Sequence, residues 1–146
     1  MKFRVERDVL AEAVTWVARA LPTNPPVPVL AGLLLEASAD GVLRLSSFDY
    51  EVSARIEVSA DVADPGTVLV SGRLLADISR SLPNWPVDVA TDGSRVELTC
   101  GASRFTLLTM PVDDYPSLPT MPEAAGVVGG HDLTQAVAQV TVAASR

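Results

Sequence analysis

The chain has 146 residues, of which 48% are hydrophobic and 20% are charged, and this composition is typical of a folded globular protein rather than a disordered one. Its net charge of −7 argues against a freestanding, high-affinity nucleic-acid binder, because such proteins are usually basic. Cys100 is the only cysteine, which excludes an intrachain disulfide and favours a reducing cytoplasm. The longest apolar stretch, at 27–35, is far shorter than the ~20 residues that span a bilayer, so we expect no membrane association.

A short segment occurs three times in the chain. The copies begin at Arg7, Gly72 and His131, and each reads as the first turns of an amphipathic helix that follows a strand-like run. Only strand-like segments separate the first two helices. We therefore expect a pseudo-symmetric α+β domain of two strand–helix–strands units, followed by the start of another domain.

The first unit begins with an expected strand at residues 2–6. The apolar stripe of the following helix is expected to contain Leu10, Ala13, Val14, Val17 and Leu21. Prolines between positions 22 and 28 end this helix and predict an extended loop. Strands are expected at 33–37, 42–46 and 52–58, with a turn at 39–41.

The second unit begins with an expected strand at 67–70 and a helix that Ser71 caps. The expected buried stripe of this helix is Leu74, Leu75, Ile78 and Leu82. A hairpin turn at Asp92-Gly93 joins the next two strands, and Phe105 and Leu107 alternate with polar residues in the last one.

Residues 110–122 contain four prolines and two adjacent aspartates, which predicts a linker of restricted flexibility. Residues 127–129 and a helix from Asp132 then read as the first strand and helix of a second domain. The predicted domains are therefore 1–120 and 121–146. Because the last helix has an apolar face with no partner, we expect the chain to be a fragment.

The residues predict no catalytic or metal site. Cys100 ends an alternating strand and is expected to pack, and His131 belongs to no Cys/His cluster. The pair Asp113-Asp114 lacks the further oxygen ligands that a hard metal ion needs. No phosphate-binding glycine loop is present. We expect no enzymatic activity and no cofactor.

Two arginines of the second helix form a candidate surface for a polyanion. Arg73 and Arg80 lie seven residues apart, and hence on one side of the helix, opposite its apolar stripe. The alternative is an ordinary solvated face on which Asp77 pairs with a neighbouring arginine, and the residues alone favour this alternative.

Six stretches, in their order and spacing, resemble the bacterial sliding clamp, the β subunit of the replicative DNA polymerase, with an actinobacterial character. They are residues 1–7, 26–35, 48–52, 70–78, 103–107 and 110–116. The resemblance implies a DNA-clamp fold of two β-α-β-β-β units, with two helices on one face of antiparallel sheets. It also implies a non-catalytic processivity factor, whose homodimeric ring encircles duplex DNA and tethers the polymerase.

The resemblance also assigns residues to two surfaces. Arg73 and Arg80 would face DNA, and Asn24 stands in a loop where the family often has an arginine. The edge that joins a second subunit would hold Leu74, Arg95, Arg104, Phe105 and Leu107. Core packing is the alternative for Phe105 and Leu107.

The polymerase and the clamp loader would bind through domains absent from this chain. Two other interpretations stay open. One is a standalone α+β enzyme or ligand-binding protein, for which no polar pocket is identified. The other is a truncated or diverged clamp copy that acts as a non-ring interaction module. The net charge of −7 fits a ring, because a ring is retained on DNA by topology and needs only weak phosphate contacts.

Overall fold

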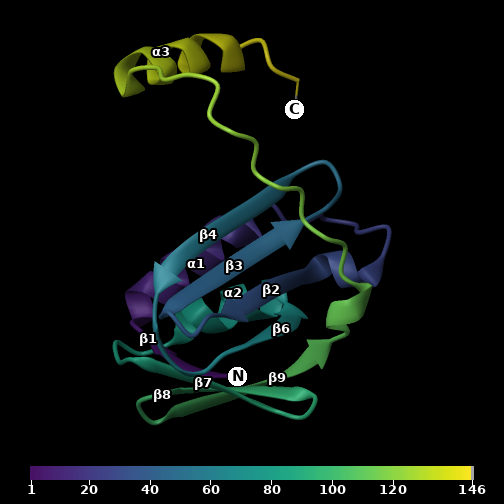
Figure 1. Cartoon of the computed structure of the whole chain (residues 1–146), viewed down its shortest axis with the longest axis vertical. Coiled ribbons are helices and arrows are strands. Elements are labelled where there is room, and N and C mark those ends of the chain that lie inside the picture. Colours follow the sequence, from purple (N-terminus) through teal and green to yellow (C-terminus); the bar gives the residue numbers. More distant parts are fainter. Residues whose placement is uncertain (146) are drawn as a thin grey trace.

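The computed structural model describes residues 1–145, which contain nine strands and three α-helices (Figure 1). The first unit consists of β1 (Lys2–Val5), α1 (Arg7–Ala18), the 3-10 helix η1 (Pro28–Ala31), β2 (Gly32–Ala37), β3 (Val42–Phe48) and β4 (Ser53–Ser59). The second unit consists of β5 (Asp61–Asp64), β6 (Gly66–Ser71), α2 (Gly72–Ser81), β7 (Val87–Asp92), β8 (Arg95–Cys100) and β9 (Ser103–Met110). The 3-10 helix η2 (Val112–Asp114) and α3 (Gly130–Thr141) follow.

All strand pairs are antiparallel, in the order β4-β3-β2-β6-β9-β8-β7-β1-β5. The strand that precedes the helix in each unit pairs with the other unit, since β1 pairs with β7 and β6 pairs with β2, and the short β5 adds to the outer edge of β1. The remaining strands of each unit form a meander, β2-β3-β4 or β7-β8-β9. This arrangement confirms the predicted α+β fold of two β-α-β-β-β units.

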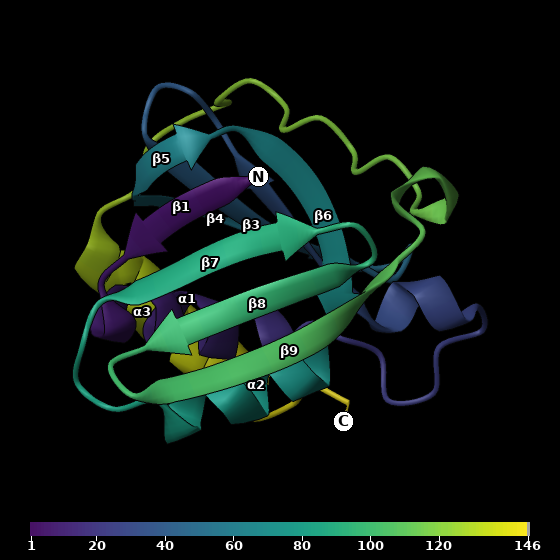
Figure 2. The ribbon, with the colours of Figure 1, turned by 90° about the horizontal axis from the view of Figure 1, so that it is seen from below.

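Helices α1 and α2 contact each other and lie on one face of the sheet (Figures 1 and 2). The core lies between them and the strands and is built from fully buried aliphatic side chains, among them Leu10, Val14, Val17, Leu33, Leu43, Leu45, Val70 and Leu98. Two polar contacts fix the helices further. The buried Ser47 hydroxyl donates to the carbonyl of Val17 (3.0 Å), and Arg7 Nε donates to the carbonyl of Leu82 at the end of α2 (3.2 Å).

Several sequence-based expectations are wrong in detail. Leu74 is 47% exposed rather than buried, because α2 packs on the sheet through Gly72, Leu75, Ala76, Ile78, Ser79 and Leu82. Helix α1 ends at Ala18, so Leu21 lies in the turn after it, where it packs against Gly72. The proline-rich loop contains η1, and the short strand β5 was not expected. Residues 127–129 form no strand.

The segment after η2 extends away from the sheet and ends in α3 (Figure 1). No residue of α3 is buried, and its exposed apolar side chains are Leu133, Val137 and Val140. Within residues 1–145 no helix combines the length and the hydropathy needed to cross a membrane.

Candidate nucleic-acid interface and open strand edge

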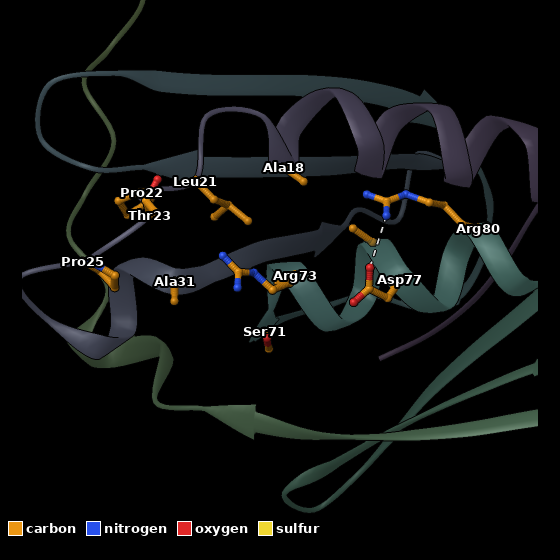
Figure 3. A pocket seen from close by; sticks show the side chains of 11 residues that line it. Ala18, Leu21, Pro22, Thr23, Pro25, Ala31, Ser71, Arg73, Asp77 and Arg80 are labelled. Carbon is orange, nitrogen blue, oxygen red and sulfur yellow. Dashed lines mark hydrogen bonds and ion pairs between the residues drawn. The ribbon is translucent and has the colours of Figure 1, made fainter.

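The side of α1 and α2 that faces away from the sheet carries a concentration of arginines. Arg73 and Arg80 are both exposed and both line a groove of about 400 Å³ between α2, the end of α1 and the following loop. In Figure 3 both guanidinium groups lie on the side of α2 that faces α1 and this loop. The structure therefore brings these two arginines to one surface, as their spacing predicts.

A second groove, of about 500 Å³, adjoins the first because Arg80 lines both. Its other charged side chains are Arg7, Glu12 and Arg19 of the α1 region. The two linings together contain four arginines and two carboxylates. This surface therefore has a positive balance on a chain whose net charge is −7.

The arginines differ in how firmly they are held. Arg80 Nη1 donates to Asp77 Oδ1 at 3.2 Å, but both side chains are 62% exposed, so this pair contributes at most about 1 kcal/mol. Arg73 and Arg19 make no ion pair within 4.0 Å with any residue in 1–145. Both guanidinium groups are therefore available to an anion.

Asn24 is exposed in the loop after α1, but its side chain does not line the groove. Its neighbours Thr23 and Pro25 do line it. The loop from Pro22 to Pro26 carries no charged residue. The resemblance assigns Asn24, Arg73 and Arg80 to the DNA-facing residues, and of these only the two arginines line the groove.

Strand β9 has an open edge. Residues 103–108 pair with β8 on one side, whereas only Thr109 and Met110 pair with β6 on the other. Arg104 is exposed on β9, Arg95 is exposed on β8 opposite Leu108, and Phe105 is partly buried against the core. Leu74, on the neighbouring α2, is exposed as well.

Leu107 is a correction to the expected edge residues. Its side chain is 1% exposed and belongs to the core, whereas the next residue, Leu108, is 69% exposed. Because successive side chains of a strand point to opposite faces, the pair Leu107-Leu108 places one leucine on each face. Sequence reasoning missed Leu108, although two consecutive leucines at the end of an alternating strand are a usable signal.

Arg7 and Arg19 were also missed as members of the arginine surface. The sequence places Arg19 on the polar face of α1, but it does not reveal that α1 and α2 lie side by side. Their contact is what joins Arg19 to Arg80 across the second groove. Each helix therefore carries exposed arginines that the sequence shows, but these arginines form one surface only because the two helices pack together.

The residues considered for catalysis or metal binding take up structural or exposed positions. The Cys100 thiol is buried, 3.2 Å from the carbonyl oxygens of Pro83 and Trp85. Asp113 and Asp114 are exposed in η2, and His131 is exposed on α3. Residues 1–145 contain no group of three or more His, Cys, Asp or Glu side chains placed to hold a metal ion.

Comparisons with known proteins agree with this architecture. The chain is 66% identical over all 146 residues to the beta sliding clamp of Streptomyces coelicolor and 61% identical to that of Micrococcus luteus, and it spans 39% and 47% of their lengths. It is 48% identical to a beta sliding clamp homolog, GriR, of Streptomyces muensis, of which it spans 39%.

Solved structures and a family model give the same assignment. The Caulobacter crescentus pol III beta structure matches 94% of this chain, with a TM-score of 0.87 and 26% identity, over 38% of its own length. A Pseudomonas aeruginosa sliding clamp matches 84% of this chain, with a TM-score of 0.77 and 34% identity, over 33% of its own length. Residues 1–119 match the model of the DNA polymerase III beta subunit, N-terminal domain, and the chain therefore belongs to this family.

Proposed function

We propose that the protein containing this chain is a DNA replication processivity factor, a sliding clamp that encircles duplex DNA and tethers the replicative polymerase without itself catalysing a reaction. The relatives named beta sliding clamp, matched over the whole chain at 61–66% identity, support this proposal. The chain spans less than half the length of these relatives, so residues 1–120 would be one domain of the ring and residues 121–146 the start of the next. A role on bacterial DNA places the protein in the cytoplasm.

The observation that carries the proposal is the cluster of arginines on the helix side of an acidic chain. The helix side holds Arg7, Arg19, Arg73 and Arg80, whereas the chain as a whole has a net charge of −7. Such a protein cannot rely on phosphate neutralisation for strong binding. A ring needs only weak contacts on its inner wall, and the helix side supplies them.

Two open strand edges support a place in a ring wall. In the first unit, β4 pairs only with β3, and the exposed Val9 of α1 lies on the same side as Ile56 and Val58 of β4. In the second unit, β9 has its open edge beside Leu74. Val9 and Leu74 occupy the same position of the internal repeat. We infer that each edge joins a neighbouring domain.

We assign the β9 edge to a second subunit. The apolar centre of this interface would be Leu74, Phe105 and Leu108, and Arg95 and Arg104 would form its charged rim. Leu107 is left out because it is buried in the core. Contacts with the polymerase and the clamp loader are assigned to domains beyond this chain.

The alternative, a diverged copy that acts as a non-ring interaction module, is less well supported. The identity to the two proteins named beta sliding clamp, 66% and 61%, exceeds the 48% to the homolog GriR. The unpaired edge of β9, which a ring-forming subunit would need for its partner, is also present.

Retention on DNA tests the proposal. The full-length protein, assembled on nicked circular duplex DNA, should stay bound through a high-salt wash and should leave when the circle is cut once. Equal loss from circular and linear DNA would refute encirclement, and equal retention would indicate binding by affinity.

A further inference from the structure

We infer that Trp85 is an aromatic anchor for the second subunit, placed beyond the end of the open β9 edge. Trp85 belongs neither to β9 nor to α2, and lies instead in the loop between α2 and β7. The inference rests on the proposed function, because the occupant of this surface is a second copy of the same protein. Its indole is buried when the two subunits join, so the contact is mainly hydrophobic.

The backbone of Trp85 is firmly held although its side chain is 62% exposed. Its N–H donates to the carbonyl of Pro83 at 2.8 Å, and its own carbonyl oxygen lies 3.2 Å from the buried Cys100 thiol. The next residue, Pro86, restricts the backbone further. A large apolar side chain on a fixed backbone has little freedom to lose on binding, which favours a role as an anchor.

The loop places this indole beside the β8–β9 turn (Figure 2). Val87, the first residue of β7, pairs with Cys100, the last residue of β8. A Cβ added at Gly101 would lie 2.9 Å from Cδ1 of Trp85, so the indole lies directly against this glycine. Ser103, two residues later, begins the open edge of β9. Trp85 therefore adjoins the end of the edge opposite to that of Leu108.

The size of the β9 edge argues for a further contact at this end. Residues 103–108 span about 17 Å, at about 3.4 Å per residue. A stable interface uses about 20–30 residues and buries about 800 Å² on each partner. A tryptophan buries about 150–250 Å², and tryptophan is enriched among the residues that contribute most binding energy. Contact with Trp85 extends the proposed interface beyond Ser103.

A purely structural role is the competing explanation. In this role the indole covers Gly101 and shields the end of the core at Cys100 from water. Replacing Trp85 would then lower the melting temperature and leave the affinity between subunits unchanged. The accessibility of the indole to a quencher in solution would also be the same in the monomer and the dimer. The two explanations therefore differ in two measurable properties.

The first test measures dimer dissociation of the full-length protein by sedimentation velocity over a range of concentrations. Trp85→Ala should raise the dissociation constant about 30-fold, as expected for a buried aromatic anchor. Trp85→Phe should raise it less, because part of the apolar surface is kept. The matched control is Tyr50→Ala, which removes an aromatic side chain of similar exposure, 64%, from the turn between β3 and β4. This control should dissociate like the wild type.

The second test measures acrylamide quenching of the Trp85 fluorescence, taken as the difference between the wild type and Trp85→Phe. The indole should be several-fold less accessible in the dimer than in the monomer obtained by dilution. This measurement needs only the wild type and a conservative variant, so it decides the question even if Trp85→Ala does not fold. Equal accessibility in monomer and dimer would overturn the inference.

The outcomes separate this inference from the proposed function. If Leu108→Asp dissociates the dimer but Trp85→Ala behaves like Tyr50→Ala, the anchor is refuted and the β9 edge stands. If Leu108→Asp leaves the dimer intact, the assignment of the edge and this inference fail together. A lower melting temperature of Trp85→Ala with an unchanged dissociation constant assigns Trp85 to the core and also overturns the inference.

Discussion

Neighbouring residues of this chain can have opposite roles, and the leucine pair of β9 shows it most clearly. Leu107 is 1% exposed and lies in the core, whereas Leu108 is 69% exposed on the open edge. The period of a strand predicts that the two side chains point apart, but it does not state which one faces the helices. Which leucine is buried depends on how β9 packs against the rest of the domain, and the local alternation of residues does not determine this packing.

Leu107→Ala should therefore lower the free energy of unfolding by about 2–5 kcal/mol, because it leaves a cavity in a closed core. Leu108→Ala, in the same strand, should change it by no more than about 0.5 kcal/mol. Urea denaturation of the chain, followed by circular dichroism, measures both. Equal effects of the two substitutions would contradict the assigned faces.

Tyr115 gives the chain a predictable response to alkaline pH. Burial against the small cluster of Val29, Leu30 and Leu69 raises the pKa of Tyr115 to about 12 from 10.0. The unfolded chain loses this proton at lower pH than the folded chain does, so stability is complete below pH 10 and falls as the pH rises towards 12. Tyr115→Phe should remove part of this fall in urea titrations between pH 9 and 12. A slope identical to that of the wild type would show that Tyr115 is not buried in solution.

At the scale of elements, the sequence predicts what each segment forms better than where it lies. The alternation in β4, the Asp92-Gly93 turn between β7 and β8, and the capping position of Ser71 were all predicted and are confirmed. These features depend on local chemistry. Gly93, for example, adopts a positive φ of 58°, which suits glycine.

The errors at this scale concern packing between elements. Leu74 was predicted in the buried stripe of α2 but is exposed at its side, and Val9, which the predicted stripe of α1 did not include, is exposed at the equivalent position. In both helices an exposed apolar residue precedes a buried leucine, Leu10 or Leu75. The repeat contains this pattern, but the sequence does not show that each exposed residue lies beside an open strand edge. That position is what suggests a role in contacts between domains. The arginine surface is a similar case, since it needs two helices side by side.

The N-cap of α2 can be tested alone. The Ser71 hydroxyl accepts from the backbone N–H of Leu74 at 3.4 Å, a long contact, so Ser71→Ala should cost about 0.5–1 kcal/mol. Ser81→Ala is the control, because its hydroxyl donates only to the carbonyl of Asp77 within the last turn. Thermal unfolding compares the two variants. A loss as large for Ser81→Ala would remove the special role of the cap.

At the scale of the whole molecule, the account depends on the β9 edge joining a second subunit. In the full-length protein, Leu108→Asp should shift the dimer towards monomers, because it puts a charge into the apolar centre of the proposed interface. Val52→Asp, at an exposed apolar residue of the turn before β4, is the matched control within the same domain and should leave the dimer intact. Sedimentation velocity over a range of concentrations reads out both. An unchanged dimer for Leu108→Asp would place the subunit interface elsewhere.

The central claim is that the helix side of this domain faces DNA while the strand side faces away. Cys100 is the only cysteine of these 146 residues and is buried, so single cysteines at positions 73 and 55 can carry a photo-crosslinker once any exposed cysteine in the rest of the full-length protein has been replaced. Arg73 lines the groove on the helix side, whereas Arg55 alternates along β4 with Ala54 and Ile56, which face α1. When the full-length protein is loaded on circular duplex DNA, position 73 should crosslink to DNA and position 55 should not. Crosslinking at position 55 equal to or above that at position 73 would contradict the account.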